Sequence, residues 1–296
     1  MLSLSVEALS VVTELSERPL YWAELGLSPI ALDLGFFTLK WYSLAYLVGI
    51  LVGYWHLSRM ARAPGSPLAQ RHADDLFFYA TLGIIFGGRM GYVLFYAPEQ
   101  FAANPLDIFK LWEGGMSFHG GLIGTVLAIT WVTWRGRISF LRTSDYIAVC
   151  APFGIMLGRL ANFVNGELWG RVAHSHVPWA MVFPGAGPAP RHPSQLYEAV
   201  LEGFLLSIIL LIAFWKTSAR WRPGLLVGIF ALGYGLSRFV VEYFREPDEQ
   251  LQEFARITGF SMGQWLTMPL ILIGLVLLIR ALVRPPLGSG KRLARA

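Results

Sequence analysis

Six charged residues lie inside stretches that are otherwise apolar, namely Arg89, Arg159, Arg238, Glu198, Glu202 and Glu242. A charge at the centre of a bilayer costs about 2.5–3.5 kcal/mol even on a lenient insertion scale, so such residues usually face a wet cavity and are usually functional. The planar guanidinium of arginine matches the oxygens of phosphate bidentately. Arg159 and Arg238, with too few carboxylates nearby in the sequence, therefore predict a site for an anionic ligand.

Spacing places several polar side chains on shared helix faces. Tyr234, Arg238 and Glu242 are spaced i, i+4, i+8, and Arg159 and Asn162 are spaced i, i+3. Glu198 could orient one of the two guanidinium groups as a supporting residue. A second interpretation stays open, in which Arg238 and Glu242 form only a buried ion pair that holds helices together.

The glycine-rich segment 114–122 contains a single histidine, His119, which could act as a general base near neutral pH or could simply position the segment. Arg89 lies among Gly87, Gly88 and Gly91, where close helix packing is expected. It could be a donor between helices or a contact to a lipid headgroup. His192, bracketed by Pro190 and Pro193, is expected to be structural.

The composition of the chain indicates whether lipid or water surrounds these residues. The chain has 296 residues, of which 55% are hydrophobic and 15% are charged, with a mean hydropathy of +0.51. A soluble domain carries about 25% charged residues, so much of this chain must face lipid. The formal charge of +5 does not indicate nucleic acid, because the basic residues form short clusters between apolar runs.

A bilayer core needs about 20 apolar residues per helix. Seven segments meet this requirement, and they are 41–58, 75–97, 118–134, 145–165, 195–215, 225–244 and 262–283. The sequence thus predicts an all-α integral membrane protein with seven transmembrane helices. We expect an amphipathic N-terminal arm (1–40) on the periplasmic surface, a transmembrane catalytic domain (41–284) and a basic cytoplasmic tail (285–296).

The distribution of basic residues predicts the orientation. Arginine and lysine gather after the first, third and fifth spans and in the tail, and acidic residues dominate the other side. The positive-inside rule then puts the C-terminus in the cytoplasm and the N-terminus outside. At 1.5 Å per residue, Arg159 lies about 21 Å and Arg238 about 20 Å along spans that run outward. The polar groups should therefore meet in the outer third of the membrane.

Residues 158–171, which read GRLANFVNGELWGR, closely resemble the signature of the phosphatidylglycerol–prolipoprotein diacylglyceryl transferase family. The resemblance extends in the same order over about residues 24–284. The other matching segments are Trp41-Tyr42, Gly87-Gly88-Arg89, the His119 segment, residues 191–198, residues 234–248 and residues 261–264.

The resemblance implies a bacterial inner-membrane enzyme with its site towards the periplasmic leaflet. Such an enzyme moves the diacylglyceryl group of phosphatidylglycerol onto the lipobox cysteine of a prolipoprotein, ahead of signal peptidase II, and needs no metal or organic cofactor. The expected catalytic residues are Arg159, Arg238, His119, Glu198 and Tyr234, and the expected substrate-binding residues are Tyr42, Arg89, Asn162, Glu167, Gly170, Glu242 and Arg245.

Two other classes of protein would also bury such charges. A non-enzymatic phospholipid or anion transporter would place arginines in a cavity, but near the midplane and reachable from both sides. A membrane scaffold would leave the six intramembrane charges without a purpose. The outward skew of the polar cluster and the lack of an inverted repeat favour the enzyme.

Overall fold

The computed structural model describes residues 19–35, 38–246 and 252–287. Several parts of the sequence prediction lie outside these ranges. They are most of the N-terminal arm, Pro247 and Asp248 of the matching segment 234–248, and residues 288–296 of the basic tail.

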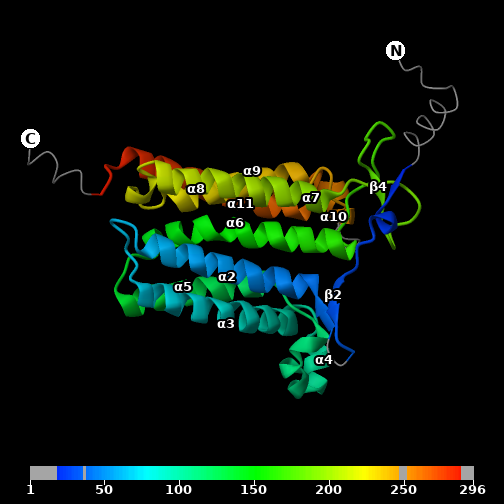
Figure 1. Cartoon of the computed structure of the whole chain (residues 1–296), viewed down its shortest axis with the longest axis horizontal. Coiled ribbons are helices and arrows are strands. Elements are labelled where there is room, and N and C mark those ends of the chain that lie inside the picture. Colours follow the sequence, from blue (N-terminus) through cyan, green and yellow to red (C-terminus); the bar gives the residue numbers. More distant parts are fainter. Residues whose placement is uncertain (1–18, 36–37, 247–251, 288–296) are drawn as a thin grey trace, which may run out of the picture. The chain divides into compact units, whose positions relative to one another are not determined.

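Helices dominate the described chain (Figure 1). The α-helices are α2 (Trp41–Ala61), α3 (Gln70–Phe95), α4 (Pro98–Ala103), α5 (Phe118–Gly136), α6 (Phe140–Asn165), α7 (Ser194–Glu198), α8 (Leu206–Lys216), α9 (Leu225–Val241), α10 (Gln252–Thr258) and α11 (Met262–Val283). A π-helical segment, η4 (Ala199–Leu205), joins α7 to α8. Short 3₁₀ turns cover Trp22–Leu25, Pro105–Phe109, Leu111–Glu113 and Ala219–Trp221.

Every predicted span coincides with a helix, although several ends differ. The helix α6 begins at Phe140 rather than 145, and α3 begins at Gln70 rather than 75. The helix α9 ends at Val241 rather than 244. The turns that extend α3 and α6 at their starts contain polar residues, so they lie outside the continuous apolar stretches from which the spans were predicted.

Four helical segments in the described chain are both long enough and apolar enough to cross a membrane: Gln70–Phe95, Phe140–Asn165, Ser194–Lys216 and Met262–Val283. The apolar helix α9 is shorter, with 17 residues. The helices α2 and α5 coincide with two further predicted spans but are not among these four. The structure is thus mostly helical and consistent with a membrane protein.

Short strands, which were not predicted from the sequence, accompany the helices. The strand β1 (Leu20–Tyr21) pairs in parallel with β4 (Met181–Val182), and β2 (Ile30–Asp33) pairs antiparallel with β3 (Thr38–Lys40). These strands are too short to show the alternation by which a strand is identified in sequence.

The chain divides into two compact units. Of the described residues, 19–35, 38–46, 155–204, 234–246 and 252–269 form unit 1, and 47–154, 205–233 and 270–287 form unit 2. In unit 1, Trp22 is buried with Met181, Phe183 and Ala186. The Trp22 indole nitrogen also donates to the Phe163 carbonyl oxygen at 2.8 Å. The described part of the N-terminal arm is therefore anchored into unit 1.

In unit 2, α3 and α5 lie side by side (Figure 1) with glycines at their contact. A Cβ atom added to Gly124 would lie 2.0 Å from the Gly83 carbonyl oxygen, and one added to Gly87 would lie 2.3 Å from the Gly120 carbonyl oxygen. Only glycine permits backbones to approach this closely. The expectation of close helix packing around Gly87 is confirmed.

A second contact within unit 2 connects Asp145 of α6 to the start of α9. The Asp145 carboxylate is buried and accepts hydrogen bonds from the backbone N–H groups of Gly224, at 2.7 Å, and Val227, at 2.9 Å. The first N–H groups of a helix have no partner within the helix. Asp145 thus caps the start of α9, and it sits in the second turn of α6 rather than in a loop.

Gly124→Ala should destabilise the protein by about 1–3 kcal/mol, because the new methyl group has no space against the Gly83 carbonyl. Gly154→Ala is the matched control, since a Cβ there meets nothing within 4 Å. Melting of both variants in detergent micelles, compared with the wild type, tests this. Equal melting temperatures for the two variants would show that the α3–α5 contact can relax.

Candidate functional site

Glu198, at the end of α7, is the centre of a buried ion cluster in unit 1. Its Oε2 atom lies 2.5 Å from Arg159 Nε and 3.2 Å from Arg238 Nη1, and its Oε1 atom lies 3.2 Å from Arg245 Nη1. The Glu198 side chain is 1% exposed. One carboxylate therefore orients three arginines, where the sequence analysis expected it to orient one.

Arg238 is held from a second side by Glu242. The Arg238 Nη2 atom lies 2.5 Å from Glu242 Oε1, so the i, i+4 pair considered from the sequence does form. Ser261 Oγ donates to Glu242 Oε2 at 2.6 Å, and Gly263 leaves space for that carboxylate, since a Cβ there would lie 2.5 Å from its carbon. The ion pair accounts for Arg238 and Glu242 but not for Arg159.

Glu202 is the third carboxylate of this cluster and is fully buried. Its Oε1 atom lies 3.9 Å from Arg238 Nη1. Three arginines thus face three glutamates, and the prediction that Arg159 and Arg238 lack nearby carboxylates is wrong. That prediction failed because Glu198 and Glu202 come from a different helix, which sequence spacing could not bring into range.

The π-helical segment Ala199–Leu205 lies between the two parts of this helix and carries Glu202. Such segments are rare and occur often at functional sites. Gly203, in the same segment, lies against the backbone of α6, since an added Cβ would lie 2.5 Å from Met156 Cβ and 2.7 Å from its Cα. This close approach brings the turn that bears Glu198 next to the turn that bears Arg159.

Arg159 is the most exposed arginine of this cluster. Its Nε atom pairs with Glu198, and its side chain is 22% exposed, compared with 14% for Arg238 and Arg245. Within the described residues, neither terminal nitrogen of Arg159 makes a hydrogen bond or ion pair. A guanidinium that is oriented on one edge and open on the other can present its remaining donors to phosphate.

Two tyrosines lie near these charges. The Tyr234 hydroxyl, in α9, interacts electrostatically with Glu202, Arg238 and Arg159. The Tyr42 hydroxyl, at the start of α2, lies 3.3 Å from the Tyr46 hydroxyl and interacts electrostatically with Glu167 and Arg159. Both belong to unit 1, as do the arginines of the cluster.

Glu167 links the end of α6 to the following loop. Its Oε1 atom accepts from Asn162 Nδ2 at 2.9 Å and from Asn165 Nδ2 at 3.0 Å. Asn162 is buried one turn after Arg159, whereas Glu167 is exposed. The Glu167 carbonyl oxygen also accepts from Gln195 Nε2 at 2.6 Å, which ties this loop to α7.

Gly170 positions Arg245 through the backbone. It forms a β-bridge with Arg245, and a Cβ added to it would lie 2.4 Å from the Phe244 carbonyl oxygen and 2.7 Å from the His192 carbonyl oxygen. The Arg171 N–H donates to the Phe244 carbonyl at 2.8 Å. The signature segment therefore holds the chain that carries Arg245, and the need for glycine at 170 is steric.

His192 belongs to an aromatic group beside this bridge. Its Nδ1 atom lies 3.0 Å from the Tyr197 hydroxyl, which also accepts from Trp179 Nε1 at 2.6 Å. Burial, and then the charge of His174, lowers the pKa of His192 below its ordinary value, which favours the neutral ring at pH 7. These contacts agree with the structural role expected for His192.

Arg191 is a residue of this site that sequence reasoning missed. Its Nη1 atom lies 3.0 Å from Glu246 Oε2 and 3.1 Å from the Gly170 carbonyl oxygen, and its guanidinium lies 4.4 Å from the Trp169 ring. It thus joins the signature loop to the chain after α9. Its presence in the matching segment 191–198 was the only available signal.

Arg89 and His119 belong to unit 2. Arg89 is buried, and its guanidinium donates to five carbonyl oxygens, those of Asp107, Ile108, Lys110, Gly114 and Gly115. This number equals the donor capacity of a guanidinium. The geometry favours the structural alternative for Arg89, which fixes the loop before α5. His119 is exposed in the first turn of α5.

The chain matches the family model described as prolipoprotein diacylglyceryl transferase over residues 29–280. Proteins named phosphatidylglycerol–prolipoprotein diacylglyceryl transferase are similar over nearly their full length. The one from Erythrobacter litoralis is 58% identical over 286 residues, covering 96% of this chain and 100% of its own. Those from Zymomonas mobilis and Rhodospirillum rubrum are 54% and 50% identical, and each covers 88% of this chain and 93% and 95% of its own. The chain belongs to the prolipoprotein diacylglyceryl transferase family.

Glu198→Gln should destabilise the protein by about 3–5 kcal/mol, because it leaves three guanidinium groups around a neutral amide in a buried site. Melting in detergent micelles measures the effect. Glu253→Gln is the matched control, since Glu253 pairs with Arg256 on the surface at 2.9 Å, with side chains 65% and 79% exposed. Exposed pairs contribute little, so the control should melt like the wild type. Wild-type melting of Glu198→Gln would exclude it as the anchor of the cluster.

Proposed function

We propose that this chain transfers the diacylglyceryl group of phosphatidylglycerol to the thiol of the lipobox cysteine of prolipoproteins. The family match and the shared name of the full-length relatives support this activity. The observation in the molecule that carries the proposal is the open edge of Arg159, which is oriented by the buried Glu198 and can hold a phosphate.

The reaction is a displacement at carbon. The cysteine sulfur attacks the glyceryl carbon that carries the phosphate ester, the carbon–oxygen bond breaks, and glycerol phosphate leaves with the electron pair. Charge gathers on the departing phosphate, so a preorganised cation at that position lowers the barrier. Arg159 supplies that cation, and Arg238 supports it through the carboxylate that both share.

The thiol must lose its proton, because the thiolate is the nucleophile and a free cysteine has a pKa of about 8.5. His119 is the proposed base, on the grounds of its residue type and its exposed place at the start of α5. Tyr42, Asn162 and Tyr234 would orient the headgroup and the peptide by hydrogen bonds. Glu167, Gly170, Glu242 and Arg245 hold the loops around them.

The position of the enzyme in the cell is part of the proposal. Seven spans, an N-terminus outside and a C-terminus in the cytoplasm follow from the placement of basic residues. The arm (1–40) and the cluster of Arg159 then belong to the periplasmic side of the inner membrane, and the tail (285–296) belongs to the cytoplasm. The product, a thioether-linked prolipoprotein, suits cleavage by signal peptidase II as the next step.

The activity is tested with the purified protein, phosphatidylglycerol labelled in an acyl chain and a lipobox peptide. We expect label on the peptide and release of glycerol phosphate. The same peptide with serine in place of cysteine should stay unlabelled, because the thiol is the acceptor. Absence of transfer by folded protein would overturn the proposal and favour a lipid or anion transporter.

Arg159→Lys should lower transfer by at least about tenfold, because lysine keeps the charge but loses the bidentate fork. Arg256→Lys, an exposed substitution in α10, is the matched control and should retain wild-type turnover. Initial rates at saturating and limiting phosphatidylglycerol distinguish lost binding from lost turnover. Wild-type rates for Arg159→Lys under both conditions would rule out the fork as the phosphate contact.

A further inference from the structure

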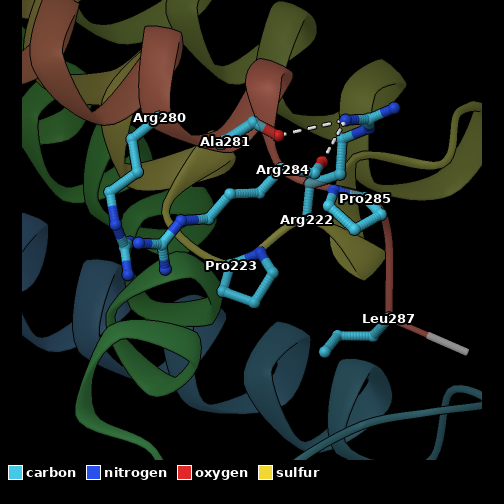
Figure 2. A pocket seen from close by; sticks show the side chains of 7 residues that line it. All are labelled: Arg222, Pro223, Arg280, Ala281, Arg284, Pro285 and Leu287. Atoms are coloured by element: carbon cyan, nitrogen blue, oxygen red, sulfur yellow. Dashed lines mark hydrogen bonds between the residues drawn. The ribbon is translucent and has the colours of Figure 1, made fainter.

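A basic pocket of about 160 Å³ lies in unit 2 beside the C-terminal end of α11 (Figure 2). Three arginines line it, Arg222 from the segment before α9, Arg280 from α11 and Arg284 directly after α11. Pro223 and Leu287 supply apolar wall. The residues that line this pocket belong to unit 2, and it shares no residue with the ion cluster of Glu198 in unit 1.

Arg222 builds the wall of this pocket. Its Nη1 atom donates to the carbonyl oxygens of Ala281 and Arg284, both at 3.0 Å (Figure 2), and to that of Leu282 at 3.2 Å. The last carbonyls of a helix lack partners within the helix and carry partial negative charge. The Leu287 N–H donates to the Trp221 carbonyl at 2.9 Å on the other side. These hydrogen bonds keep the walls of the pocket in place, and the charge of Arg222 offsets the partial negative charge at the end of α11.

The side chains of Arg280 and Arg284, unlike that of Arg222, do not donate to carbonyl oxygens of the described chain. They are spaced i, i+4, and Figure 2 shows both guanidinium groups on the side of the pocket away from Arg222. Within residues 19–35, 38–246 and 252–287, neither side chain has a hydrogen bond or ion pair. Like charges at this spacing repel each other in a helix. An anion between the two groups would remove that repulsion and satisfy their donors.

The surface beside the pocket indicates the source of the anion. An apolar stripe runs along α11 towards the two arginines, and it consists of Leu272, Val276, Ile279 and Val283, which are 62%, 54%, 54% and 80% exposed. On a helix that can cross a membrane, such a stripe contacts acyl chains. A phospholipid can therefore lay its chains on the stripe and its phosphate between the arginines.

We propose that the pocket formed by Arg222, Arg280 and Arg284 binds the headgroup phosphate of an anionic phospholipid, at the end of α11 that the basic loops predict to be cytoplasmic. This lipid is a bound ligand rather than the transferred substrate. Arg280 and Arg284 hold the phosphate oxygens, and Arg222 keeps the helix end and the following segment in place. The proposal does not depend on the transferase activity.

The experiment titrates full-length protein in detergent micelles with phosphatidic acid, with phosphatidylcholine and with inorganic phosphate, and follows the melting temperature. Phosphatidic acid is chosen because it is anionic and is not the proposed substrate. A ligand that binds only the folded state raises the melting temperature. We expect phosphatidic acid to raise it, and the other two to have little effect at the same concentration.

Arg280→Gln combined with Arg284→Gln should weaken the apparent binding of phosphatidic acid by about tenfold or more. Arg62→Gln combined with Arg135→Gln removes the same charge from two exposed sites of unit 2 and should leave binding unchanged. Arg284→Gln alone, at an exposed position, serves if the double variant does not fold. Equal binding by both double variants would overturn the site, and an equal effect of inorganic phosphate would overturn the lipid as its ligand.

Discussion

The described site depends on one buried carboxylate, that of Glu198, which is shared by three arginines. Burying charges is unfavourable unless they are paired closely and their remaining hydrogen-bonding groups are satisfied. Glu198 supplies the charge pairing for Arg159, Arg238 and Arg245 at once, and Glu242 is a second partner for Arg238. The cluster therefore demands that α6, α7 and the end of α9 approach within reach of a single side chain.

Three glycines of unit 1 allow the close approach that the ion cluster requires. Gly203 lets the π-helical segment touch the backbone of α6 at Met156, and Gly170 lets the signature loop form a bridge with Arg245. Gly263 leaves room for the Glu242 carboxylate. These glycines are needed for space at contacts, and their effect is to set the positions of the charges. In this part of the chain, the close backbone packing at these glycines therefore also determines the distances between the charged side chains.

The sequence predicted the helices and most of the partners in the cluster, but not its charge balance. Apolar stretches of about 20 residues indicate spans, and i, i+4 spacing correctly paired Arg238 with Glu242. The distance from Glu198 to Arg245 depends on the bend made by residues 242–245 and on the π-helical segment. Neither follows from local periodicity, so the three-to-three match of arginine and glutamate could not be predicted. The contacts by which Arg89 holds the loop before α5 could not be predicted either, because its partners are backbone carbonyl oxygens, which every residue carries.

Four arginines of the described chain show that context, rather than residue type, determines what a guanidinium does. Arg89 gives all its donors to carbonyls, Arg222 gives Nη1 to a helix end, and Arg238 is enclosed by carboxylates. Arg159 combines an edge that Glu198 orients with two terminal nitrogens that make no hydrogen bond or ion pair within the described residues. Its bond to Glu198 reduces its net charge effect but fixes its direction, and a cation that is already oriented needs no reorganisation when charge develops on a departing phosphate. For the proposed displacement that releases glycerol phosphate, this arrangement supports the proposal of Arg159 as the phosphate contact and of Arg238 as its support.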